Sequence, residues 1–128
     1  KIQKFLNSDY LILAMIFIDS NKFGYFRIGK DEFKSDIKIV NDKVKIWNYV
    51  KHHQVMPEDV KELAEASPEI IIFGTGHTGL CKIQPETLKY LDDKNIKYLI
   101  KDTAQACSDF NRLASSKRKV FAILHATC

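Results

Sequence analysis

Hydrophobic and polar residues alternate with a period of two along the first half of the chain. The alternation extends over most of Asp36–Val40 and Lys43–Tyr49, and in Phe23–Ile28 alternate residues fall on two sides of an extended segment. Short polar turns, such as Asn41-Asp42, separate these stretches. Because side chains on a strand point alternately to its two faces, this pattern predicts antiparallel strands. We expect three or four short strands between about residues 15 and 50.

The second half of the chain alternates between short apolar runs and helical patterns. The apolar runs at residues 70–73, 96–100 and 120–124 have the length and composition of buried strands. The helical patterns begin at Pro57, Pro85 and Thr103. This strand–helix–strand order implies right-handed crossovers and parallel strands. The sequence therefore predicts an α/β fold, a three-layer single domain in which a parallel βαβαβ unit in the C-terminal half joins short antiparallel N-terminal strands.

A length of 128 residues suits one domain with a substantial core. We interpret residues 1–14 as an extension outside this domain and residues 15–128 as the domain itself. The longest apolar run, Leu11–Ile18, is far shorter than the roughly 20 residues that cross a bilayer. Polar residues follow it where a signal peptide would have a small-residue cleavage site. The sequence therefore predicts no membrane association.

The composition is that of an ordinary soluble domain, with 45% hydrophobic and 28% charged residues. The net charge of +4 comes mainly from lysine. Because arginine is the preferred residue for forked contacts to phosphates and bases, nucleic acid is disfavoured as a partner. The three cysteines, Cys81, Cys107 and Cys128, form no C-x-x-C pair, and their small number favours the reducing cytoplasm. No metal and no cofactor is predicted.

The segment Gly74–Gly79 follows the first buried strand and fits the G-x-G-x-x-G pattern of dinucleotide-binding folds. Asp102 lies near the end of the next strand, where such folds place a ribose-binding carboxylate. In those folds, however, the helix begins inside the glycine motif, whereas Leu80–Gln84 here precede the helix at Pro85. We favour a wide turn that uses the backbone freedom of glycine over nucleotide binding, and weaker anion binding by the loop amides stays open.

The predicted topology brings three loops to one edge of the sheet. Ligands of parallel sheets bind at the carboxyl ends of the strands, and these three loops follow those ends. The candidate ligand-binding residues of this edge are Gly74, Thr75, Gly76, His77, Thr78, Asp102, Thr103 and His125. No catalytic residue is assigned.

Two further pairs of residues could have a structural role or could form a metal-binding or catalytic site. His52 and His53 lie in a polar link without acidic or cysteine neighbours at ligand spacing, so we expect a surface pair. His125 and Cys128 have the residue types of a zinc site or of a thiolate–imidazole couple. A continuing strand would point these two side chains to opposite faces, which disfavours both.

Aromatic residues are frequent in the predicted N-terminal strands. We favour core filling as their role, with an exposed patch that binds a partner as the alternative. The residues concerned are Phe23, Tyr25, Phe26, Trp47 and Tyr49.

Several short segments, in the same order, resemble the Mth938-domain family. The match begins near Phe23-Gly24, passes through Asp36–Ile39, Pro57–Val60 and Ile71–Gly76, and ends at His125-Ala126-Thr127-Cys128. The resemblance implies a compact three-layer α/β domain. It implies a role like that of family members that are assembly or regulatory factors, one of them for mitochondrial respiratory complex I, and it brings no enzymatic activity.

From the residues and the resemblance together, we expect a non-enzymatic protein-interaction module in assembly or regulation. The alternative is a small-ligand or phosphate-binding protein, or a weak enzyme, that uses the glycine-loop edge. The partner expected is another protein, and a symmetric homodimer through an edge strand or an aromatic patch stays open.

Overall fold

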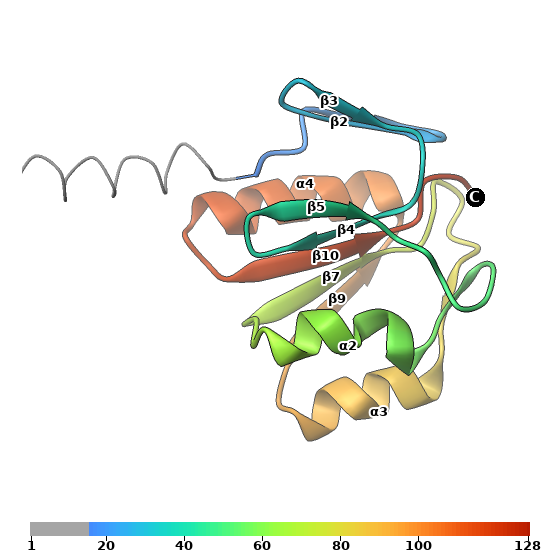
Figure 1. Cartoon of the computed structure of the whole chain (residues 1–128), viewed down its shortest axis with the longest axis vertical. Coiled ribbons are helices and arrows are strands. Elements are labelled where there is room, and N and C mark those ends of the chain that lie inside the picture. The colour runs from blue at the N-terminus through green and yellow to red at the C-terminus, as the bar shows by residue number, and fades with distance from the viewer. Residues whose placement is uncertain (1–15) are drawn as a thin grey trace, which may run out of the picture.

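The computed structural model describes residues 16–128, so the proposed extension at residues 1–14 lies outside the described residues (Figure 1). Its centre is a five-stranded sheet with the order β5-β4-β10-β7-β9. The strands are β4 (Ile37–Val40), β5 (Lys43–Ile46), β7 (Ile70–Gly74), β9 (Lys97–Lys101) and β10 (Val120–Leu124). Strands β10, β7 and β9 are parallel, whereas β4 and β5 are antiparallel additions beside β10. The predicted parallel unit joined to antiparallel strands is confirmed.

The N-terminal half contains more strands than the sequence pattern predicts. β1 (Ser20–Lys22), β2 (Tyr25–Ile28) and β3 (Asp31–Phe33) form a separate antiparallel sheet. With β4 and β5, residues 16–50 therefore contain five strands in two sheets. The expectation of three or four strands, with a continuous strand over Phe23–Ile28, is wrong. Gly24 has a φ of +75° and lies in the turn between β1 and β2, so the strand begins only at Tyr25.

Three helices lie among the described residues, and each begins where the sequence predicts it. They are α2 (Pro57–Glu65), α3 (Pro85–Asp93) and α4 (Thr103–Ser115). Proline suits the first helical position because its missing N–H would have no partner there. None of the helices in residues 16–128 has the length and apolar character that a bilayer crossing requires.

Alternate side chains of the central strands face two separate cores, which explains the three-layer architecture. Ile70 and Ile72 of β7 pack toward α4 and the β1–β3 sheet, whereas Ile71 and Phe73 pack toward α2 and α3. Figure 1 shows α4 on one side of the central sheet and the other two helices on the opposite side. Because strand side chains alternate between faces, a strand covered on both faces is apolar throughout.

A small parallel sheet forms where the sequence suggests only connections. β6 (Gln54–Val55) pairs with β8 (Lys82–Ile83), and the amide of Lys82 donates to the carbonyl of His53 at 2.9 Å. This pairing ties the segment before α2 to the segment before α3. The pairing thereby brings His53 close to residues 125–128.

Candidate functional site

The carboxyl ends of β7, β9 and β10 meet at one edge, as the sequence analysis expects. Thr103 joins the three loops that follow these strands. Its hydroxyl donates to the carbonyl of His125 at 2.7 Å and accepts from the amide of Gly76 at 2.8 Å. Thr103 is completely buried, so it fastens the edge together and does not present its hydroxyl to solvent.

The glycine loop is occupied by the protein's own backbone. The amides of Thr75 and His77 donate to the carbonyls of Lys101 and Thr127 at 2.9 and 2.7 Å. The hydroxyl of Thr78 donates to the carbonyl of Cys128 at 3.0 Å. The amide of residue 76 is bonded to Thr103, as described above. The amides of residues 75, 76 and 77 therefore have no free N–H for an anion. The geometry is that of a wide turn packed against residues 127 and 128.

The other predicted residues of the edge have structural contacts. Gly74 is buried, and a side chain added to it would press on Leu124 and Thr103. Asp102 is exposed and caps α4, where its carboxylate accepts from the amide of Gln105 at 2.9 Å. His77 lies half-buried beside the ring of Phe23, with centroids 6.5 Å apart.

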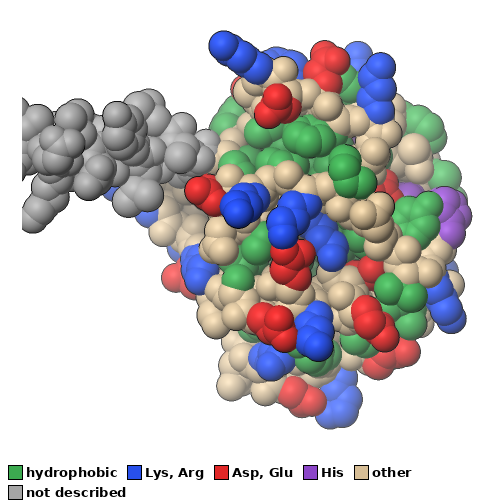
Figure 2. Space-filling view, viewed as in Figure 1, with side chains coloured by type: hydrophobic (Ala, Val, Ile, Leu, Met, Phe, Trp, Pro, Cys, Tyr) green, Lys and Arg blue, Asp and Glu red, His purple; other side chains and the backbone are tan. Residues whose placement is uncertain are grey.

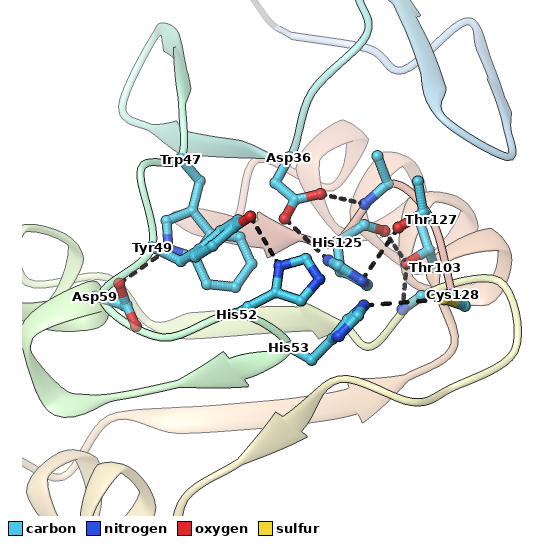
Figure 3. Close-up of polar contacts among 12 residues, drawn as sticks. Asp36, Trp47, Tyr49, His52, His53, Asp59, Thr103, His125, Thr127 and Cys128 are labelled. Carbon is cyan, nitrogen blue, oxygen red and sulfur yellow. Dashed lines mark hydrogen bonds and ion pairs between the residues drawn. The ribbon is translucent and has the colours of Figure 1, made fainter.

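His125 is the predicted residue with chemically distinctive surroundings. Its Nδ1 lies 2.9 Å from Oδ2 of Asp36, whose Oδ1 accepts from the amide of Ala126 at 2.6 Å (Figure 3). Only 2% of His125 and 9% of Asp36 are exposed. A carboxylate at Nδ1 holds the ring in one orientation and leaves Nε2 toward Thr127, whose hydroxyl lies 3.4 Å away.

The two histidines of the polar link are not a simple surface pair, contrary to expectation. His53 is half-buried with its ring against His125, with centroids 4.9 Å apart, whereas the neighbouring His52 is exposed. Nε2 of His53 lies 3.9 Å from Sγ of Cys128. His53 has a φ of 62°, an uncommon backbone conformation that the β6–β8 pairing maintains. Within residues 16–128, no three His, Cys, Asp or Glu side chains are arranged to hold a metal ion.

An open cleft of about 510 Å³ lies beside the buried pair. Its lining includes Lys34, Asp36, Trp47, Tyr49, His52 and His125. Figure 3 shows the rings of Trp47, Tyr49 and His52 next to one another, with the hydroxyl of Tyr49 2.8 Å from Nδ1 of His52. The indole of Trp47 donates to the buried carboxylate of Asp59 at 3.0 Å, which fixes this wall of the cleft.

The aromatic residues of the N-terminal strands divide between core and surface. Phe26 and Trp47 are buried, as core filling requires, but Phe23 is 63% exposed and Tyr49 is 38% exposed. Core filling is therefore wrong for these two residues. Phe23 lies in the turn between β1 and β2, and Tyr49 lies beyond the end of β5, so neither ring has a sheet face to pack on.

We expect His53 to make stability depend on pH. Partial burial lowers the pKa of His53, and the rings of His52 and His125 add to this effect, whereas Asp36 opposes it. The unfolded chain therefore takes up a proton near the ordinary histidine pKa of about 6.5, before the folded chain does. The free energy of unfolding should fall as the pH drops through that value. Denaturant unfolding from pH 8 to pH 5 measures the fall, which His53→Asn should reduce, and equal slopes for both proteins would contradict the assignment.

We also expect Cys128 to be the reactive thiol of the folded protein. Burial raises the pKa of both Cys81 and Cys107 to about 12, helped at Cys81 by the charges of Asp36 and Asp59. Cys128 is free and half-buried. Since the thiolate is the nucleophile, iodoacetamide at pH 7.5 should alkylate Cys128 in the folded protein and all three cysteines after denaturation. Peptide mapping by mass spectrometry identifies the site, and alkylation of Cys81 at an equal rate would refute the expectation.

Comparisons with known proteins extend over nearly the whole described domain. A family model described as "Protein of unknown function (DUF498/DUF598)" matches residues 18–125. The chain is 28% identical over 111 residues to the NADH dehydrogenase (ubiquinone) 1 alpha subcomplex assembly factor 3 of Xenopus tropicalis. That alignment covers 85% of this chain and 60% of the relative, so the chain spans less than two thirds of that protein's length.

Solved structures share the fold. A conserved hypothetical protein from Pyrococcus horikoshii is 25% identical, with a TM-score of 0.78, and the match covers 87% of this chain and 98% of that one. A Mth938-like domain protein from Bordetella pertussis is 18% identical, with a TM-score of 0.65, over 88% of this chain and 87% of that one. At that identity the second likeness concerns the fold alone.

Proposed function

The chain belongs to the DUF498/DUF598 family of Mth938-like domains, and we propose that it is a non-enzymatic protein-interaction module in assembly or regulation. The relative from Xenopus tropicalis is named as an assembly factor. Because this chain spans only 60% of that protein, the transfer of the role rests on the surface described below.

Exposed apolar side chains at the carboxyl edge of the central sheet carry the proposal. Four of the large exposed hydrophobic residues lie on the turns and strand ends around residues 125–128, and we call them the apolar rim: Phe23, Ile46, Tyr49 and Leu80. The amides of Gly24 and Leu80 donate to the carbonyls of Ala126 and Cys128, each at 2.8 Å. Figure 2 shows hydrophobic side chains beside the histidines on this side of the molecule.

An exposed apolar group of this kind is typical of a protein–protein contact. The polar groups of the same edge support the absence of catalysis. Asp36, Thr103 and the amides of Thr75, Gly76 and His77 bond within the chain, so these groups stabilise the edge. The glycine-loop alternative is weakened, because the amides of Thr75, Gly76 and His77 are not available to a ligand.

We also propose the cytoplasm as the cellular location and residues 15–128 as the domain. Free thiols at all three cysteines are compatible with the reducing cytoplasm. Residues 15–128 are taken as the interacting domain and residues 1–14 as an extension outside it. A second copy of the chain is the alternative partner.

Affinity purification of the tagged chain from its own cells tests the proposed interaction. We expect a reproducible set of partners that the double variant Phe23→Ser/Leu80→Ser loses at least fivefold. The matched control is Phe17→Ser, because Phe17 is 54% exposed and precedes Ile18, whose amide bonds to Asn111 in the second half of α4, away from the apolar rim. Equal recovery with all three proteins, once circular dichroism shows that they are folded, would refute the proposal, as would the absence of any reproducible partner.

A further inference from the structure

The cleft beside the buried Asp36–His125 pair is continuous with the apolar rim. Ile46 and Tyr49 belong to both. A volume of about 510 Å³ is in the range of sites that enclose a small ligand or a few residues of a peptide. A partner that covers the rim would therefore meet a concave feature large enough to take one of its short segments.

The polar groups of Asp36 and Trp47 in the cleft already have partners within the chain. Both carboxylate oxygens of Asp36 are bonded, one to the ring of His125 and the other to the amide of Ala126. The indole N–H of Trp47 is bonded to Asp59. The ring of Trp47 meets Tyr49 edge to face, with centroids 5.9 Å apart, so this wall of the cleft offers apolar ring surface.

Two hydrogen-bond donors of the cleft carry the inference, and one of them has a positive charge. Lys34 lines the cleft and forms no ion pair with any residue from 16 to 128. Nδ1 of His52 is bonded to the hydroxyl of Tyr49. When that hydroxyl donates, the proton of a neutral His52 ring lies on Nε2, which is then a donor.

We propose that the cleft binds an acidic residue of a partner protein, flanked by an apolar residue. The carboxylate of this segment pairs with Lys34 and His52, and the apolar side chain packs on Tyr49 and Ile46. A carboxylate fits better than a phosphate because the negative charge of Asp36 in the same cleft repels a dianion more strongly than a monoanion. The inference deepens the proposed interaction and rests on it.

Trp47 is the chain's one tryptophan, so its fluorescence reports directly on the cleft. The probe is a panel of blocked pentapeptides with a central Glu flanked by Leu, Ile, Val, Phe or Tyr, each paired with a twin that has Gln at the centre. We expect at least one Glu peptide to change the fluorescence saturably and to bind at least fivefold more tightly than its twin. The difference should shrink between 20 and 200 mM salt, since it is electrostatic.

Two variants locate the contact. Lys34→Met should abolish the preference for Glu, whereas Lys30→Met should preserve it, because Lys30 is an exposed lysine of the nearby β2–β3 turn that does not line the cleft. The inference is overturned if no peptide binds, if Glu and Gln peptides bind equally, or if acetate or inorganic phosphate competes at the concentration of the peptide. Partner recovery that depends on the apolar rim, together with a failed titration, would reject this inference and leave the proposed function standing.

Discussion

Replacing Gly76 with alanine should cost about 3 kcal/mol of unfolding free energy. Gly76 has a φ of +104°, a conformation that L side chains rarely adopt. A Cβ atom there would overlap the carbonyl carbon and oxygen of Cys128 and lie 3.0 Å from the ring of His125. The backbone of residues 125–128 would have to move, and the hydrogen bond between the Gly76 amide and Thr103 would be strained. Urea unfolding followed by circular dichroism measures the loss.

Gly24→Ala is the matched control for the contact at Gly76. Gly24 also has a positive φ, +75°, but an added Cβ would meet nothing within 4 Å. Its substitution should therefore cost only the conformational penalty of about 1–2 kcal/mol. Equal losses of unfolding free energy in the two variants would show that residues 125–128 can move aside without cost. The close contact between the glycine loop and these residues would then contribute nothing to stability.

The parts of the fold that the sequence predicts are those with local signals. Continuous apolar runs mark β7 and β10 because both faces of these strands are covered, and Pro57 and Pro85 mark the starts of helices. The Asn41-Asp42 turn marks the hairpin of β4 and β5, where Asn41 has a φ of 56°. Each signal depends on only a few neighbouring residues, so it can be recognised without knowledge of the tertiary structure.

The extra N-terminal sheet and the β6–β8 pair lack such signals. Gly24 interrupts an alternating stretch, and a glycine in such a stretch is compatible with a strand or with a turn. The β6–β8 pair has two residues in each strand, so no periodicity can appear. Its position depends on packing between the segments that precede α2 and α3.

The candidate site was predictable only in part. Topology alone brings Gly76, Thr103 and His125 to one edge, and their hydrogen bonds confirm that juxtaposition. Asp36 lies 89 residues from His125 along the chain, and no spacing rule connects them. The one available hint was an acidic residue immediately before the apolar residues of β4, a place where a carboxylate is buried only with a partner.

The carboxyl edge of the sheet therefore combines internally hydrogen-bonded loops with exposed apolar residues, and the sequence does not distinguish the two. The loops whose sequence suggests phosphate binding are hydrogen-bonded to one another, and the residues exposed beside them include those of the apolar rim. A glycine-rich loop needs free amides to bind an anion, and here the amides of residues 75, 76 and 77 bond to Lys101, Thr103 and Thr127. The arrangement favours a rigid platform for a partner over a catalytic pocket.

Asp36→Ala should lose about 3 kcal/mol of unfolding free energy. The variant leaves Nδ1 of His125 and the amide of Ala126 without their shared partner, and both groups are buried. Removing one member of a buried polar pair exposes the other to the full cost of desolvation. The freed ring should also lose its fixed orientation against His53, which broadens the imidazole resonances in NMR spectra.

Two comparisons separate this effect from a general loss of charge. Asp36→Asn keeps an acceptor oxygen and should lose less than the alanine variant, because one of the two hydrogen bonds survives. Asp93→Ala removes an exposed carboxylate that pairs with Lys89 on the surface of α3, and it should change stability by less than about 0.5 kcal/mol. If Asp36→Ala is as stable as Asp93→Ala, water replaces the lost partner without cost, and the pair does not hold the end of β10 in place.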